Sequence, residues 1–245
     1  MKAAKQRLDL LLVARGCFES RERAQRAIMA GEVIVDEHRV DKPGTQVAGD
    51  AAIVVKGGER YVSRGGLKLE AGLGAFGINP TGVVCVDIGA STGGFTDCLL
   101  QRGAARVYAL DVGHGQMDWK IRSDPRVVAR EKVNARHLRR EDLPEAPGIC
   151  TIDVSFISLT LILPPAFEVV LPTGVILALI KPQFELGKKE VGKGGIVRDA
   201  AGHEAAVEKI RDFVTGRLGR TWVGVIESPI LGGEGNKEFL ACLRP

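Results

Sequence analysis

The stretch of sequence that decides the fold lies at residues 86–100 and reads VDIGASTGGFTDCLL. Asp87 closes an apolar strand, three glycines crowd the turn that follows, and a helical pattern begins at once. Glycines between a strand and a helix let the backbone approach a ligand closely. Such a turn can hold a phosphate, a dinucleotide or the amino-acid end of a methyl donor, so its remaining residues must decide between them.

Two of these ligands fit the turn poorly. A phosphate-binding loop ends in Gly-Lys-Ser or Gly-Lys-Thr, which this turn does not contain. A dinucleotide-binding fingerprint has a glycine where Ser91 stands. The turn instead resembles the first motif of class I methyltransferases, which passes under the methionine end of S-adenosylmethionine. The resemblance implies donor contacts from Asp87, Gly89, Ala90, Ser91, Thr92, Gly93, Gly94, Phe95 and Thr96.

The chain around and after this turn alternates apolar strands with helices. Nearly continuous apolar strands are typical of a parallel sheet that is covered on both faces. The predicted strands are 83–87, 106–111, 127–131, 149–153, 175–181, 221–227 and 237–243. The last two are joined by a short loop, so we expect the final strand to run antiparallel. The pattern predicts an α/β, Rossmann-like class I methyltransferase domain with a seven-stranded, mostly parallel sheet.

Polar residues end several of these strands. The carboxyl ends of parallel strands share one edge of a sheet, and ligands bind there in open α/β folds. Asp111 has the position of the acid that holds ribose hydroxyls in both nucleotide-binding and methyltransferase folds, and a solvated strand-end carboxylate is its alternative reading. Asn134 is a weaker candidate for contact with adenine, and a purely structural asparagine is an equal alternative.

Four charged residues are the candidates for chemistry, namely Lys68, Asp153, Lys181 and Glu238. Asp153 and Lys181 end the fourth and fifth strands, Lys68 lies in a helix predicted over 64–76, and Glu238 lies in the last strand. Lys181 follows an apolar run, and burial favours the neutral form of an amine, which suits a base. Taken singly, each of the four fits an ordinary salt bridge equally well.

The first sixty residues form a separate module. Leucines at helical spacing predict a helix over 5–15, and Ser20 is placed to cap a second helix in which Ile28 and Met29 supply apolar contacts. Short strands are predicted at 33–35 and 52–55. Residues 5–56 resemble the ribosomal-protein-S-four type of RNA-binding domain, although the hairpin tip at 36–39 lacks the glycine usual in that family.

The domains expected from these patterns are an RNA-binding domain at 1–56, a linker at 57–63 and the methyltransferase domain at 64–245. The net charge of +4 equals the excess carried by residues 1–30, which hold seven basic and three acidic side chains. This concentration favours an anionic partner. The basic loop at 186–199 fits either a phosphate-gripping lid or a solvated mobile loop. The RNA-binding candidates are Arg7, Arg15, Arg21, Arg23, Arg26, Arg64, Lys188 and Lys189.

Composition narrows the class of protein further. Five cysteines without metal-type spacing predict free thiols and no metal site. No apolar run approaches the ~18 residues of a membrane span, and the first residues lack a signal-peptide cleavage site. We therefore expect a cytoplasmic protein without a membrane partner. The oligomeric state stays open.

Five motifs taken in order, SRGGLKLE, VDIGASTGGFTDCLL, TIDVSF, IKPQFE and NKEFL, resemble the TlyA family over nearly the whole chain. That family joins the small RNA-binding domain to an FtsJ-like methyltransferase. The resemblance implies S-adenosylmethionine-dependent 2′-O-methylation of cytidine in ribosomal RNA. It also assigns Lys68, Asp153, Lys181 and Glu238 to the Lys-Asp-Lys-Glu tetrad of FtsJ-like enzymes, and adds Asp153 to the residues near the donor.

The chemistry of the transfer explains these residue types. A ribose hydroxyl is a poor nucleophile, so Lys181 would either accept its proton when neutral or stabilise the developing alkoxide when charged. The rival hypotheses are a membrane-active cytolysin, as an older label of the family suggests, a non-catalytic RNA-binding protein on a decayed fold, and a nucleotide-dependent oxidoreductase.

Overall fold

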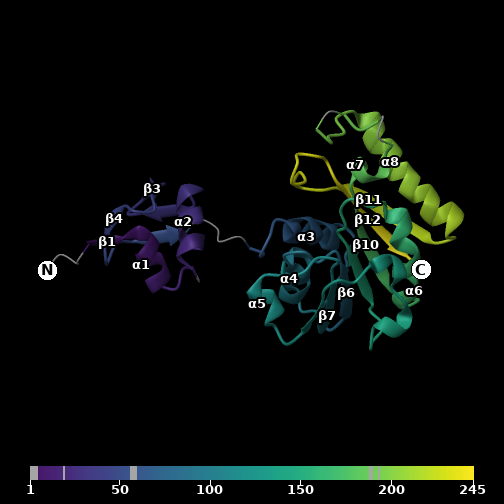
Figure 1. The fold of residues 1–245 in the computed structure, drawn as a ribbon, viewed down its shortest axis with the longest axis horizontal. Helices are drawn as coiled ribbons and strands as arrows, with labels where there is room; N and C mark the ends of the chain where they lie inside the picture. The colour runs from purple at the N-terminus through teal and green to yellow at the C-terminus, as the bar shows by residue number, and fades with distance from the viewer. Residues whose placement is uncertain (1–4, 19, 56–59, 188–189, 193) are drawn as a thin grey trace. The chain divides into compact units, whose positions relative to one another are not determined.

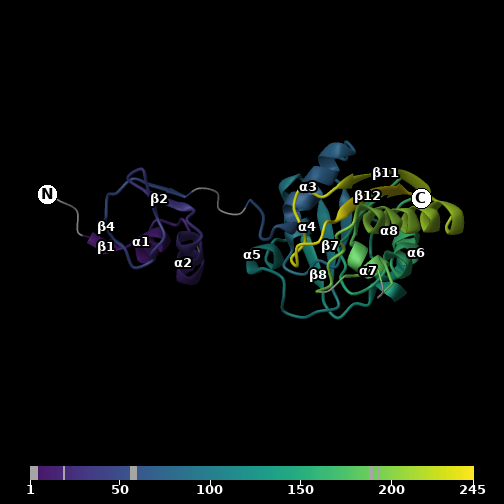
Figure 2. The same cartoon turned by 90° about the horizontal axis from the view of Figure 1, so that it is seen from above.

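The computed structural model describes residues 5–18, 20–55, 60–187, 190–192 and 194–245. The chain divides into two compact units, residues 1–60 and 61–245, which Figures 1 and 2 draw and which are described one at a time below. Within the linker expected at 57–63, residues 57–59 lie outside the described part of the chain, and Tyr61 is buried in the second unit.

The first unit is a small α+β fold. Two helices pack around one core with a three-stranded antiparallel sheet of order β3-β2-β5, and a second, two-stranded sheet pairs β1 with β4. Leu8, Leu11 and Leu12 share one helix face and are buried, as their spacing predicts. The elements are β1 (Lys5–Arg7), α1 (Leu8–Ala14), α2 (Arg21–Met29), β2 (Val33–Val35), β3 (His38–Val40), β4 (Gln46–Ala48) and β5 (Ile53–Val55).

Two expectations for this unit are wrong. The helix predicted from residue 5 begins only at Leu8, because Lys5–Arg7 pairs as a strand with Gln46–Ala48. Met29, predicted to supply core contacts, is 60% exposed, whereas its neighbour Ile28 is fully buried. Ser20 does cap α2 as predicted, since its side chain accepts a hydrogen bond from the Arg23 backbone N–H.

The hairpin between β2 and β3 turns without a glycine. Asp36 and Glu37 have φ angles of 46° and 68°, so both central residues of the turn adopt the left-handed conformation. The Asp36 carboxylate offsets part of this strain by accepting a hydrogen bond from the Ala52 backbone N–H at 2.9 Å. An aspartate that ties the turn to β5 therefore replaces the glycine usual at this position.

The second unit is a three-layered α/β fold. Its seven-stranded sheet has the order β11-β12-β10-β9-β6-β7-β8, in which β12 is antiparallel to both neighbours and the pairs among β10, β9, β6, β7 and β8 are parallel. The structure confirms the predicted fold class and the antiparallel last strand. The strands are β6 (Val84–Ile88), β7 (Arg106–Leu110), β8 (Val127–Arg130), β9 (Ile149–Ile152), β10 (Val175–Ile180), β11 (Thr221–Glu227) and β12 (Phe239–Arg244).

Alternate residues of the strands feed two cores on the two faces of the sheet. Cys85 and Leu177 pack with α3, α4 and α5, whereas Val86 and Ile176 pack with α6 and α8. Figure 1 shows α3 and α4 on one side of the sheet and α6 on the other. The helices are α3 (Gly65–Ala75), α4 (Gly94–Gln101), α5 (Trp119–Arg122), α6 (Leu163–Val169), α7 (Pro182–Glu185) and α8 (Ala200–Asp212).

Short helical turns complete the second unit. Three 3-10 turns, η1 (Ala135–His137), η2 (Arg140–Asp142) and η3 (Leu159–Leu161), lie in loops beside the sheet, and η4 (Phe213–Arg217) extends α8 as a π-helical turn. Across the described parts of both units, no helix combines the length and the hydropathy required to cross a membrane.

Candidate active site

Lys181 and Asp153 form an ion pair at the edge of the sheet. Lys181 follows β10 and Asp153 follows β9, and the lysine Nζ lies 2.6 Å from Asp153 Oδ1. The lysine also donates a hydrogen bond to Ser155 Oγ at 2.9 Å. The Lys181 residue is only 9% exposed, so its amine sits in a largely enclosed place next to a carboxylate.

Lys68 and Glu238 form a second ion pair with the same chemistry. The Lys68 Nζ lies 2.5 Å from Glu238 Oε2, and the two residues are 8% and 3% exposed. Lys68 comes from α3 and Glu238 immediately precedes β12, so the pair joins segments that are far apart in the sequence. Because buried charges are stable only when paired, each lysine here depends on its acid.

The register of the sheet explains why the two pairs meet. β10 and β12 pair antiparallel with Ile180 opposite Phe239, so Lys181 and Glu238 are the next opposed positions. Side chains of opposed residues point to the same face. Asp153 follows β9 on that face as well, because β9 pairs parallel with β10.

Helix α3 covers this face and delivers Lys68 to it. The helix comes close to the sheet at Gly72, where an added Cβ would lie 2.9 Å from Leu240 Cδ2. Lys68 lies one turn earlier on the same helix, next to Glu238 just before the start of β12. The four residues predicted from the sequence are therefore brought to one face and one edge of the sheet.

The glycine turn lies directly beside this group. Gly89 has a φ of 85°, and a Cβ on it would lie 2.4 Å from the carbonyl oxygen of Asp153. Only glycine permits this approach, because the conformation is left-handed and the space is occupied. Of the remaining turn residues, Ser91 and Thr92 are exposed, whereas the members from 93 to 96 and Ala90 are buried.

Asp87 supports the turn from within the protein. It is fully buried, and its carboxylate accepts hydrogen bonds from Thr96 Oγ1 at 2.7 Å and from Thr151 Oγ1 at 2.9 Å. Burial raises the pKa of Asp87 to about 6, with a smaller contribution from the charge of Asp153, while the two hydroxyls act in the opposite direction. Asp87 and Thr96 thus hold the turn in shape and do not line its open side.

Asp111 contacts the backbone on the exposed side of the glycine turn. Its Oδ2 accepts a hydrogen bond from the Ser91 backbone N–H at 2.7 Å, and its Oδ1 accepts one from the Gly113 N–H at 2.7 Å. Asp111 also lines a small pocket at the ends of β7 and β8. The other lining residues are Ser91, Ala109, Gly113, Gln116, Met117, Ala129, Arg130 and Glu131.

Glu131 is a residue of this pocket that the sequence reasoning missed. Its carboxylate accepts hydrogen bonds from the Gly115 N–H, the Arg122 guanidinium and the His114 ring, and these hold the pKa of Glu131 down at about 2. The available signal was its position at the end of the third strand, which matches that of Asp111 in the second.

Asn134, the weaker candidate for contact with adenine, caps a short helical turn. Its side-chain oxygen accepts a hydrogen bond from the Arg136 N–H at 3.2 Å and caps η1. Asn134 is exposed and is not among the residues that line the pocket. The structural reading of this asparagine is therefore the one the geometry favours.

Arg7, Arg15 and Arg21 each bind groups inside the first unit. Arg7 and Arg21 bind the fully buried carboxylate of Asp9, at 2.8 Å and 2.9 Å. The Arg7 guanidinium is the main reason that the pKa of Asp9 lies well below its ordinary value, with Gln25 and Arg21 adding to the effect. Arg15 donates to the backbone oxygens of Gly49 and Ala51.

The positions of the other candidates in the fold are as follows. Arg23 lies near the start of α2 with its side chain partly buried, and Arg26 is exposed one turn later on the same helix. Arg64 is exposed at the start of α3 in the second unit. Lys188 and Lys189 lie outside the described residues.

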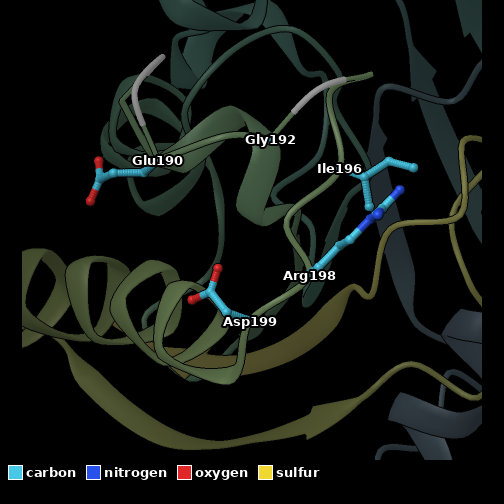
Figure 3. A pocket seen from close by; sticks show the side chains of 5 residues that line it. All are labelled: Glu190, Gly192, Ile196, Arg198 and Asp199. Carbon is cyan, nitrogen blue, oxygen red and sulfur yellow. The ribbon is translucent and has the colours of Figure 1, made fainter.

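A separate pocket of about 200 Å³ is lined by residues of the basic segment at 186–199. Figure 3 shows its lining, in which the Arg198 side chain extends toward the same side as Ile196, and Glu190 and Asp199 lie on the other side. Glu190 and Asp199 accept hydrogen bonds from the Gly187 and Gly202 backbone N–H groups. None of the four tetrad residues lines this pocket, so it is distinct from the candidate site. Among the described residues, no cluster of His, Cys, Asp and Glu has the geometry of a metal site.

Comparisons with known proteins agree with this geometry. The FtsJ-like methyltransferase family matches residues 61–245 and the S4 domain matches residues 6–53. "Putative rRNA methyltransferase YqxC" of Bacillus subtilis is 50% identical over 99% of this chain and 87% of its own length. The 16S/23S rRNA (cytidine-2'-O)-methyltransferase TlyA of Mycobacterium tuberculosis is 44% identical over 99% of this chain and 91% of its own. A solved structure named "Putative hemolysin from Streptococcus thermophilus" superposes with a TM-score of 0.75 at 46% identity, covering 98% of this chain and 88% of that one.

Proposed function

The chain belongs to the FtsJ-like methyltransferase family and also carries an S4 domain, and from this premise we propose that it methylates the ribose 2′-hydroxyl of cytidine in ribosomal RNA with S-adenosylmethionine as donor. The observation that carries the proposal is the gathering of two lysine–carboxylate pairs beside the glycine turn. Transfer to a hydroxyl needs a group that takes up its proton or balances its charge, and this edge of the sheet supplies one.

The residues around the turn fit S-adenosylmethionine. Ser91 and Thr92 are exposed at the mouth, and Asp111 faces a small pocket at the ends of β7 and β8. Each oxygen of the Asp111 carboxylate accepts one backbone hydrogen bond and keeps a further lone pair, which would accept a ribose hydroxyl of the donor. Bound donor supplies a methyl group on a sulfonium, a good electrophile.

Lys181 acts on the nucleophile. A neutral Lys181 would accept the proton of the ribose hydroxyl as the oxygen attacks, and a charged Lys181 would stabilise the alkoxide as it forms. Asp153, 2.6 Å away, balances the positive charge of the lysine, whether that charge is present from the start or arrives with the proton of the hydroxyl. The largest share of the rate enhancement comes from holding the reacting groups in line.

Lys68 and Glu238 complete the site as a neutralised pair. Glu238 faces Lys181 across the register of β10 and β12 and is itself paired with Lys68, so the positive charge of Lys68 is balanced by the acid. The ion pair connects the first turn of α3 to the residue before β12. This connection keeps both segments in place beside Lys181.

The S4 unit supplies affinity for RNA. Its second helix carries Arg23 and Arg26 near its start, where phosphates are attracted by both the side chains and the free backbone N–H groups. Arg64 and the basic loop of the second unit would add contacts near the reacting ribose. The partner is then ribosomal RNA, presented in a ribosomal subunit in the cytoplasm and recognised by shape.

The test incubates the protein with each purified ribosomal subunit and donor labelled in its methyl group. We expect label in ribosomal RNA, and reverse-transcription stops at low nucleotide concentration should map it to the ribose of a cytidine. Label found only on a base or on protein, or in neither subunit, would reject the proposal. Calorimetry with NAD and a liposome-leakage assay address the oxidoreductase and cytolysin alternatives directly.

A further inference from the structure

Ser155 lies beside Lys181 in the turn that follows β9. Lys181 Nζ donates a hydrogen bond to its Oγ at 2.9 Å. Asp153 Oδ1 is nearer, at 2.6 Å, yet it accepts no hydrogen bond of proper geometry from any residue that the structure describes. The carboxylate therefore supplies opposite charge, whereas the serine hydroxyl supplies the directional contact.

We propose, resting on the function proposed above, that Ser155 is a positioning residue that sets the direction in which the Lys181 amine faces the ribose hydroxyl. The nitrogen of a lysine side chain is tetrahedral, with one bond to carbon and three remaining positions. A single close contact to Asp153 leaves the group free to turn about that contact. A second contact, to Ser155, fixes which remaining position is left for the substrate.

The same argument holds in both protonation states. A neutral amine whose hydrogens face Asp153 and Ser155 presents its lone pair to the third direction, where it accepts the proton of the nucleophile. A charged amine presents its third N–H there instead, toward the developing alkoxide. In either state the third direction is fixed by the turn that holds Ser155.

That turn has an unusual backbone conformation. Phe156 has a φ of 63°, a left-handed conformation that is rare for a bulky residue, although the residue is 86% exposed. Its ring packs on that of Phe184 in α7 with 5.1 Å between the ring centroids. The turn is thus tied to the helix that begins directly after Lys181.

The buried side chain of Glu185 binds the segment that follows Phe156. Glu185 in α7 accepts hydrogen bonds from Ser158 Oγ at 2.6 Å and from the Leu159 N–H at 2.7 Å. Lys209 of α8 donates to the backbone oxygen of Glu185 at 2.5 Å and holds it in turn. These contacts keep the loop carrying Ser155 and the segment carrying Lys181 in one arrangement.

Ser155 itself is exposed, which makes the test clean. A Ser155→Ala change removes one hydroxyl at the surface and should leave the melting temperature within about 2 °C of wild type. We expect kcat for methyl transfer to ribosomal RNA to fall about 10- to 100-fold, because misdirecting a reacting group by an ångström has an effect of that order. KM for RNA and Kd for S-adenosylmethionine should stay within about twofold, since neither ligand depends on this contact.

Two further variants separate positioning from a structural role. Ser155→Thr keeps the hydroxyl and should restore most of kcat. Thr160→Ala removes a hydroxyl from the same loop, one that contacts Ser158 and not Lys181, and should leave kcat unchanged. The proposal is overturned if Ser155→Ala keeps full kcat, if Thr fails to restore it, or if the Thr160 variant loses as much.

A crystal structure of Ser155→Ala gives a readout that needs no RNA. We expect Lys181 Nζ to leave its wild-type position or to become disordered. An amine that stays in place overturns the proposal even if the variant is slow. Wild-type protein that methylates no ribosomal RNA overturns the proposed function instead, so the two failures are distinguishable.

Discussion

Gly89 determines how closely the glycine turn can approach the end of β9. The carbonyl oxygen of Asp153 occupies the space where a Cβ of residue 89 would lie, 2.4 Å away. Any side chain at this position must push the turn away from the edge of the sheet, and the donor would meet a displaced backbone.

Gly89→Ala should therefore weaken binding of S-adenosylmethionine by roughly 10- to 100-fold, from left-handed strain of about 1–2 kcal/mol plus the displacement. Gly77→Ala is the matched control, since Gly77 also has a positive φ, 62°, but has no atom within 4 Å of an added Cβ. Isothermal calorimetry with the donor measures both. Equal affinity of the Gly89 variant and the wild type for S-adenosylmethionine would show that the glycine turn does not contact the donor.

Asp87 makes the stability of the second unit depend on pH. Its pKa in the folded protein is about 6, above the ordinary value of 3.8, so the folded state binds more protons than the unfolded chain between these values. The stabilising effect of the protonated form is complete below pH 3.8 and is lost as pH rises through 6. The loss amounts to about 3 kcal/mol.

Asp87→Asn should abolish this part of the pH dependence. As pH rises from 4 to 7, the free energy of unfolding of the variant should increase by about 2–3 kcal/mol relative to that of the wild type. The wild type alone acquires a buried charge over that range. Urea unfolding followed at several pH values measures the difference. A difference between the two proteins that does not change with pH would show that Asp87 does not titrate in this range.

At the scale of elements, Asp9 joins α1 to α2. Its buried carboxylate in α1 accepts hydrogen bonds from Arg21 at 2.9 Å and Gln25 at 2.8 Å in α2, and from Arg7 in β1. Three elements of the small unit therefore meet at one acid, whose lowered pKa keeps it ionised well below neutral pH.

Asp9→Asn should destabilise the first unit by about 1.5–3 kcal/mol, the range for hydrogen bonds to a charged group. We expect faster amide exchange in α1 and α2, weaker RNA binding and unchanged donor affinity. Asp41→Asn, at an exposed position of the same unit, is the control. If amide exchange in the Asp9 variant is as slow as in the control, Asp9 does not stabilise the packing of α1 and α2. At low pH the wild type should converge on the variant, because protonation of a carboxylate with a lowered pKa removes the same contacts.

The elements of the large unit could be predicted because burial on both faces leaves a simple signal. The inner strands read as nearly continuous apolar runs, and a polar residue directly after several of them marks the edge of the sheet, as with Asp111, Asp153 and Lys181. The tetrad was found by resemblance on top of this pattern. The register of the paired strands decides which of these end residues contact one another. This register could not be predicted from the sequence.

The errors arose where contacts distant in sequence outweigh local pattern. Residues 5–7 continue a helical pattern but pair with β4, forty residues away in the chain. Asn134 and Glu131 both lie near the end of the third strand, and the sequence alone does not show that Asn134 caps a turn while Glu131 lines the pocket. Ser155 lies within the TIDVSF motif, but nothing in the sequence shows that its hydroxyl contacts Lys181.

At the scale of the whole molecule, the proposed function assigns RNA binding to one unit and methyl transfer to the other. The first unit, residues 1–60, holds the S4 domain and most of the candidate RNA-binding arginines. The second, residues 61–245, holds the tetrad and the glycine turn. Phosphate contacts dominate affinity for RNA and depend steeply on salt, whereas donor binding depends on the geometry of one turn.

A chain that begins at residue 57 should therefore lose RNA affinity far more than donor affinity. The slope of log K for RNA against log salt should become shallower by about 0.7 for each phosphate that the shortened chain no longer neutralises. Fluorescence anisotropy with ribosomal RNA at several salt concentrations, beside calorimetry with the donor, measures the two effects. Equal losses of both affinities would show that the first unit supports the second and does not serve RNA binding alone.

The most direct measurement compares Lys181→Met with wild type in methyl transfer to ribosomal RNA, and uses Lys237→Met as control, since Lys237 is exposed and pairs with Glu227 outside the tetrad. We predict that the Lys181 variant loses at least about 10³-fold in kcat, the order of general acid–base catalysis, while it binds S-adenosylmethionine within about threefold of wild type. The Lys237 variant should transfer methyl groups at the wild-type rate. A Lys181 variant that retains activity, or that loses donor binding to the same degree as activity, would contradict the account.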